Sequence, residues 1–234
     1  MTAATDVASA AWRALATVRD PELDEPVTDL GFVASCTVSP GGEARVTLRL
    51  PTYFCAPNFA YLMVADAYAA LIATPGVRSA EVVLEDHFAA DAINNGVAAQ
   101  AGFVRSFDGE AVAELGELRA AFLRKAVMAG TDIVCRPLLA AGTTPDALRA
   151  MTLDDAPRSV ALDRLRQRRA ELGLPSGDGA PLVIDPETGE RVEDAQLPLH
   201  LRRARVTRAG IEANTSICSG MLARRYPGEI QEVP

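Results

Sequence analysis

The spacing of hydrophobic residues changes period several times in the first third of the chain. Over residues 7–18 the apolar side chains recur at helical spacing, and the segment stops before Pro21, because the residue preceding a proline disfavours helix. Residues 32–38 and 45–50 alternate apolar and polar positions on either side of a Pro-Gly-Gly turn at 40–42. This pattern predicts a β-hairpin with one solvated face.

Helical spacing returns after the hairpin. Pro57 is suited to a first helical turn, and the apolar stripe that follows runs to a Thr-Pro-Gly stop at 74–76. Residues 77–84 are rich in Val and predict a third strand. The order helix, strand, strand, helix, strand predicts a compact α+β layer with its helices packed on one face of the sheet.

The second half of the chain is mostly helical in pattern. Long or well-started helical stripes occupy residues 110–139, the segment beginning at 144–146, and residues 159–172. Residues 182–192 contain an Asp-Pro-Glu-Thr-Gly turn between two apolar arms and predict one β-hairpin. A basic segment at 201–208 then leads into a polar stretch that we expect to be turn-like.

Composition and charge divide the chain into two parts. Its 234 residues are 49% hydrophobic, enough for a sizeable core, and carry a formal charge of -8. About 14 acidic and 6 basic residues precede position 111, against about 17 of each afterwards. We therefore predict an α+β domain at 1–105 and a mostly helical region of unknown function at 106–234. The acidic balance argues against nucleic acid as a partner.

Membrane and disulfide classes are not supported by the sequence. No run of about 18 apolar residues occurs, and the first residues lack the basic start of a signal peptide, so we expect a cytoplasmic protein with no membrane partner. The four cysteines are far apart and form no CxxC pair. This spacing fits neither a disulfide framework nor a self-contained zinc or iron-sulfur site.

Four short motifs in the first half occur in a characteristic order and carry a family resemblance. They are Asp-Pro-Glu-Leu at 20–23, Val-Thr-Asp-Leu-Gly-Phe-Val at 27–33, Leu-Pro-Thr at 50–52 followed by Cys55, and Thr-Pro-Gly-Val at 74–77. Together they resemble the iron-sulfur cluster assembly domain over residues 5–105. That domain occurs in SUF-system accessory proteins, cytosolic cluster-targeting factors and maturation subunits of phenylacetyl-CoA oxygenase.

The resemblance implies that Cys55 is the functional residue. Relatives carry a reactive cysteine directly before a proline at the start of the second helix, whereas this chain has Cys55-Ala56-Pro57, with one residue inserted. A thiolate at a helix N-terminus faces unpaired backbone N–H groups, which makes it a better soft-metal ligand or nucleophile. The resemblance also places Glu22, Asp29 and Thr52 at polar positions of the family motif, with Thr52 just before the cysteine. Glu22 and Asp29 either orient a metal or accept the thiol proton, or have plain local roles, Glu22 in a solvated loop and Asp29 as the cap of the turn that follows it.

Three further side chains are candidates with a plain structural alternative. His87, between acidic and aromatic neighbours, is either a surface residue or a partner of Cys55 in a mixed metal site. Cys218, in the polar stretch near the end of the chain, is either incidental or a second metal ligand. Cys36 and Cys135 lie on apolar stripes and are expected in the core. His200 is expected at the surface where a helix begins.

These observations predict an assembly or maturation factor, chaperone-like in action, that carries a transient iron atom or iron-sulfur cluster. One soft ligand per chain does not saturate a metal, so we expect a site that is transient, shared across a homodimer or completed by a client metalloenzyme. The oxygenase-maturation relatives point to a multicomponent iron-dependent monooxygenase as client, docked by the helical second half. Two alternatives stay open: an enzyme with Cys55 as nucleophile assisted by His87 or Asp29, and an interaction module without chemistry.

Overall fold

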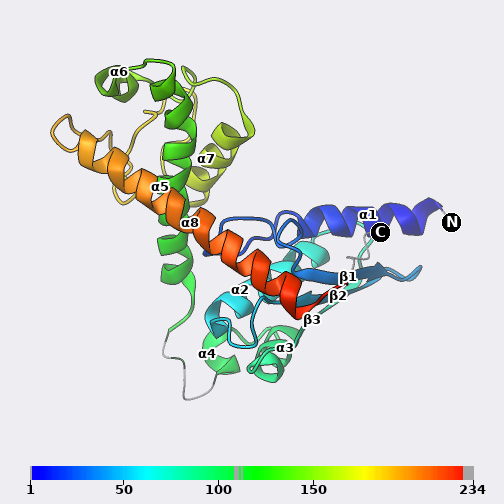
Figure 1. Cartoon of the computed structure of the whole chain (residues 1–234). Helices are drawn as coiled ribbons and strands as arrows, with labels where there is room; N and C mark the ends of the chain where they lie inside the picture. Colours follow the sequence, from blue (N-terminus) through cyan, green and yellow to red (C-terminus); the bar gives the residue numbers. More distant parts are fainter. Residues whose placement is uncertain (1, 108–110, 112, 229–234) are drawn as a thin grey trace. The chain divides into compact units, whose positions relative to one another are not determined.

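A computed structural model describes residues 2–107, 111 and 113–228. It divides into two compact units (Figure 1). The first comprises residues 1–115 together with 214–234, and the second comprises residues 116–213. This differs from the predicted division at 105/106 because the end of the last helix packs with the first unit.

The first unit is built on a three-stranded sheet. Its strands β1 (Val33–Val38), β2 (Glu43–Arg49) and β3 (Ser79–Glu85) lie in the order β1-β2-β3. The first pair is antiparallel, which confirms the predicted hairpin, and the second pair is parallel. Gly42 closes the hairpin turn at φ +83°, and a side chain there would place its Cβ 2.5 Å from the Gly76 carbonyl oxygen.

The two faces of this sheet differ as the alternation predicts. One face is apolar and buried, with Cys36, Val46 and Leu48 among its residues. On the other face, directly paired residues of β2 and β3 form ion pairs: Arg45 with Glu81 at 2.6 Å, and Arg49 with Glu85 at 3.2 Å. Cross-strand pairs of opposite charge favour this register.

Among the described residues before 107, the first unit also contains four helices. They are α1 (Thr2–Leu15), α2 (Pro57–Ile72), α3 (Ala90–Ala98) and α4 (Phe103–Ser106). Buried residues of α1 and α2, including Leu15, Met63 and Leu71, share one hydrophobic core with the apolar face of the sheet. The predicted α+β class and the element order of the layer are confirmed.

The second unit is mostly helical, as predicted. Its helices are α5 (Gly116–Ala140), α6 (Pro145–Ala150), α7 (Val160–Glu171) and the first part of α8 (Leu197–Arg225). Side-chain oxygens of Thr144 and Ser159 cap α6 and α7 by accepting from backbone N–H groups. The residue at which the long helix was expected to begin, Glu110, lies outside the described residues.

Three local expectations for the second half need adjustment. The predicted hairpin at 182–192 forms with a single antiparallel bridge, between Ile184 and Arg191, so its arms are too short to be strands. The stretch around Cys218 is helical, not turn-like, because α8 continues through it. His200 is buried at the start of α8, not on the surface. No helix in the described part of the chain is long and apolar enough to cross a membrane.

Candidate functional site

The loop between β2 and α2 places Cys55 directly before the N-terminus of a helix. Helix α2 has Ala56 as its N-cap residue and Pro57 in its first turn, so Cys55 lies one residue outside the cap. Its side chain is half-buried, and its Sγ lies 3.3 Å from the Thr52 Oγ1. The hydroxyl and the thiol named by the sequence analysis are therefore in hydrogen-bond contact.

His87 holds the backbone of this loop in place. Its Nδ1 accepts from the Ala89 N–H at 3.2 Å, which leaves Nε2 to carry the proton and donate to the Cys55 carbonyl oxygen at 2.7 Å. The side chain is buried, and this burial lowers the pKa of His87; the bond to Cys55 opposes the effect, and Arg225 adds to it. Both ring nitrogens are thus engaged by protein groups, so a neutral His87 positions the loop.

The last part of α8 brings a second thiol to the same region. Asn214 donates to the Glu22 carboxylate at 3.2 Å, and Cys218, one helical turn further, is half-buried against the core of the first unit. Burial raises the pKa of the Cys218 thiol, and the negative charges of Asp20, Cys55 and Glu22 raise it further. Cys218 and Cys55, although 162 residues separate them in sequence, thus both pack against the core of the first unit.

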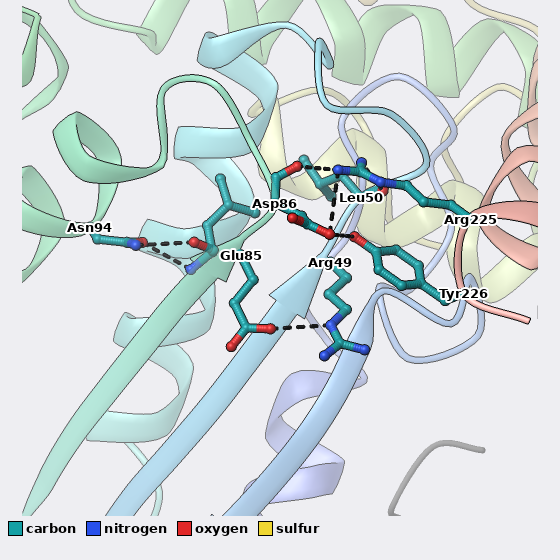
Figure 2. A network of polar contacts seen from close by, with 8 residues as sticks. Arg49, Leu50, Glu85, Asp86, Asn94, Arg225 and Tyr226 are labelled. Atoms are coloured by element: carbon teal, nitrogen blue, oxygen red, sulfur yellow. Dashed lines mark hydrogen bonds and ion pairs between the residues drawn. The ribbon is translucent and has the colours of Figure 1, made fainter. Parts of the chain in front are cut away.

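The end of α8 is held to the strand ends that flank the Cys55 loop (Figure 2). The Arg225 guanidinium donates to the carbonyl oxygen of Leu50 at 3.0 Å and also to that of Asp86. The Tyr226 hydroxyl donates to the Asp86 carboxylate at 3.1 Å, and the Tyr226 ring lies 4.9 Å from the guanidinium carbon of Arg49. We call Arg225, Tyr226 and Asp86 the C-terminal clamp.

Glu22 and Asp29 both belong to the segment 20–31 but lie in different surroundings. The Asp20 carboxylate accepts from the N–H groups of Glu22 and Leu23, each at 2.8 Å, and forms the tight turn that carries Glu22. Asp29 is exposed and lines a cavity of about 300 Å³ together with Arg49 and residues of α8. Cys55 is not among the residues that line this cavity, and the carboxylates whose charges act on the Cys218 thiol are those of Asp20 and Glu22.

The other two cysteines are core residues. Burial raises the pKa of Cys36 to about 11 and that of Cys135 to about 12, so both remain thiols at neutral pH. Among the described residues, no group of three or more His, Cys, Asp or Glu side chains is arranged to hold a metal ion. Cys55 and Cys218, in contrast to Cys36 and Cys135, are half-buried.

The sequence analysis missed the residues that assemble the site. Asn214, Arg225 and Tyr226 had no motif to mark them, and their partners lie more than a hundred residues away along the chain. The sequence had, in contrast, already singled out Cys55, Thr52 and Glu22.

Comparison with known proteins finds similarity to iron-sulfur cluster proteins. Residues 8–83 match the model of a family described as iron-sulfur cluster assembly protein. A 52-residue segment is 44% identical to an iron-sulfur cluster carrier protein of Mycobacterium leprae (strain TN), a match that covers 22% of this chain and 14% of that protein. The chain therefore spans only a small part of this relative. No solved structure matches the chain.

Proposed function

We propose that this protein, whose first half contains an iron-sulfur cluster assembly domain, is a carrier that holds an iron atom or iron-sulfur cluster transiently and delivers it to a client. The observation that carries the proposal is the placement of two half-buried thiols, Cys55 and Cys218, against the core of the first unit from distant parts of the sequence. Thiolates are the ligands that iron-sulfur clusters prefer. Both thiols are half-buried, so a client retains access to the cargo.

The surrounding groups support binding and release in different ways. Thr52 contacts the Cys55 sulfur, and His87 fixes the loop by donating a hydrogen bond to the Cys55 carbonyl oxygen. The carboxylates of Glu22 and Asp20 oppose a second negative charge at Cys218, which weakens its hold as a ligand. Two thiols also leave coordination positions on a cluster unfilled. We infer that the client, or a second chain, supplies the missing ligands, and that delivery proceeds by ligand exchange.

The client is inferred from the resemblance stated above. Maturation of a multicomponent iron-dependent monooxygenase accounts for the oxygenase-associated relatives, and a cytoplasmic location agrees with four free cysteines. Co-expression of such a monooxygenase with this chain should raise the iron content of the enzyme. Cys55→Ala should abolish that gain.

Anaerobic reconstitution with ferrous iron and sulfide tests the carrier function directly. Absorbance and counted iron and sulfide per chain should rise for the wild type, fall to background for Cys55→Ser and fall in part for Cys218→Ser. Cys135→Ala removes a thiol that lies outside the site and serves as the matched control. Full loading of Cys55→Ser would reject the proposal.

The two alternatives to the carrier function, a cysteine nucleophile and an interaction module, make different demands on the residues around Cys55. A cysteine nucleophile needs a base at its sulfur, whereas His87 contacts the Cys55 carbonyl oxygen and uses its second nitrogen on Ala89. An interaction module without chemistry remains the competing function. It predicts that Cys55→Ala supports complete metallation of the client.

A further inference from the structure

Three aromatic side chains lie together at the surface beside Cys55. The exposed fractions are 46% for Tyr53, 76% for Phe54 and 50% for Phe88. Their ring centroids are 4.9 Å apart for Tyr53 and Phe54, 5.9 Å for Phe54 and Phe88, and 6.4 Å for Tyr53 and Phe88. We call these residues the aromatic cluster. Contiguous exposed aromatics of this kind are typical of interaction sites.

The aromatic cluster and the thiol belong to one fixed piece of structure. The Phe88 N–H donates to the Tyr53 carbonyl oxygen at 3.1 Å, and His87 donates to the Cys55 carbonyl oxygen at 2.7 Å. Two hydrogen bonds therefore join the loop that carries Cys55 to the segment that carries Phe88. A molecule that packs on the aromatic rings is thereby held at a fixed position relative to the sulfur.

The charges around the cluster indicate the chemistry of its partner. Asp91 is exposed three residues after Phe88, whereas Glu85 and Asp86, also exposed, already form ion pairs with Arg49 and Arg225. The first 110 residues carry about 14 acidic and 6 basic groups. This net negative charge attracts a basic surface and opposes a second copy of the same acidic unit.

We propose that the aromatic cluster is the docking surface for a client apoprotein that presents apolar side chains inside a rim of Lys and Arg. The inference rests on the proposed carrier function, which requires the client's ligands to reach the sulfur of Cys55. It moves the client contact from the helical second half, where the sequence analysis expected it, to the immediate border of the thiol site. Exposed aromatics that become buried at an interface contribute much of its binding energy.

The test selects a phage-displayed random peptide library on the full chain, with depletion on the Phe54→Ser, Phe88→Ser double variant. Enriched peptides should combine aromatic or aliphatic residues with Lys and Arg. Fluorescence anisotropy should show their affinity falling at least about tenfold for the double variant. Their binding should also weaken with added salt. Ile72→Ser changes an exposed apolar residue of α2, 42% exposed, and should bind as the wild type does.

Several outcomes would overturn the docking assignment. Selected peptides that are acidic, or that bind the double variant equally well, would reject it. A wild-type dimer in sedimentation that the double variant dissociates would make a second copy the occupant. Loss of reconstituted iron from the double variant would assign the rings to holding the cargo.

The docking proposal and the carrier proposal can be rejected independently of each other. Cys55→Ser should lose reconstituted iron yet keep its affinity for the selected peptides. A Cys55→Ser variant that keeps both its iron and its peptide affinity would reject the carrier function and leave the docking surface standing. Loss of peptide affinity in Cys55→Ser, with its fold intact by circular dichroism, would reject docking on the rings alone.

Discussion

Each of the two units contains an arginine that donates hydrogen bonds to backbone carbonyl oxygens, and the two arginines have different roles. In the second unit, Arg169 of α7 is fully buried and donates to the carbonyl oxygens of Pro181 and Leu182. In the first unit, the partly exposed Arg225 of α8 donates to the carbonyl oxygens of Leu50 and Asp86. Each guanidinium satisfies the backbone of a segment that has few strand or helix partners of its own.

The difference between these arginines lies in what the held segment does. The 181–192 segment contributes Leu182 and Val183 to the core of the second unit, so Arg169 stabilises packing. The segments that Arg225 holds flank Cys55 and His87, so Arg225 positions a site. Arg169 therefore serves stability in the second unit, and Arg225 serves the geometry of the site in the first. Four experiments test this difference, from the largest expected effect to the smallest.

Thiol reactivity should separate the site from both cores. With limiting iodoacetamide at pH 7.5, mass spectrometry should detect alkylation of Cys55 first and of Cys218 next. Cys36 and Cys135 should react far more slowly, because burial raises their pKa values from 9.0 to about 11 and about 12 and lowers their thiolate fractions about 100-fold or more. Earlier modification of Cys36 or Cys135 would show that the assigned site is wrong.

Removal of the buried guanidinium should damage the second unit. Arg169→Met keeps the approximate volume but leaves two buried carbonyl oxygens without donors, and should lower the free energy of unfolding by about 3 kcal/mol. Urea titration followed by circular dichroism measures this loss. The exposed Arg202→Met is the control. Iron loading of the first unit should remain, and its loss together with stability would contradict the division of roles.

Loss of the C-terminal clamp should act on the site more than on stability. Arg225→Met removes two hydrogen bonds at a partly exposed position, where water replaces part of them, and should cost about 1 kcal/mol. The same variant should release reconstituted iron to a chelator several times faster, while the exposed Arg224→Met should not. A large loss of stability with unchanged iron release would make Arg225 a structural residue like Arg169.

Acidification should destabilise each unit through one buried histidine. Burial lowers the pKa values of His87 and His200 below the ordinary 6.5, so the unfolded chain binds protons that the folded chain does not. Stability should therefore be full above pH 6.5 and fall as the pH drops below it. His87→Gln and His200→Gln should each lose less stability between pH 7.5 and 5.5 than the wild type, as measured by urea midpoints. If the variants have the same pH dependence of stability as the wild type, the imidazoles are exposed to solvent and the assignment is wrong.

The sequence by itself determined the elements of the first unit and singled out Cys55 as the candidate site residue. Period-two and helical spacing located β1, β2, β3 and α2, since each pattern reports which side of one local segment is buried. Motif order identified the assembly domain, and Cys55 followed from its place before Pro57. The starts of α6 at 144–146 and of α7 at 159 depend on equally local signals, and they too were predicted correctly.

Only the tertiary structure decided what surrounds Cys55. His87 was ambiguous in sequence because burial and hydrogen-bond partners depend on a segment 32 residues away. The return of Cys218 and Arg225 to the first unit involves contacts across more than 130 residues. Periodicity carries no information about which distant surface a helix end meets, since that choice depends on complementary packing and on carbonyl groups left without partners in another part of the chain.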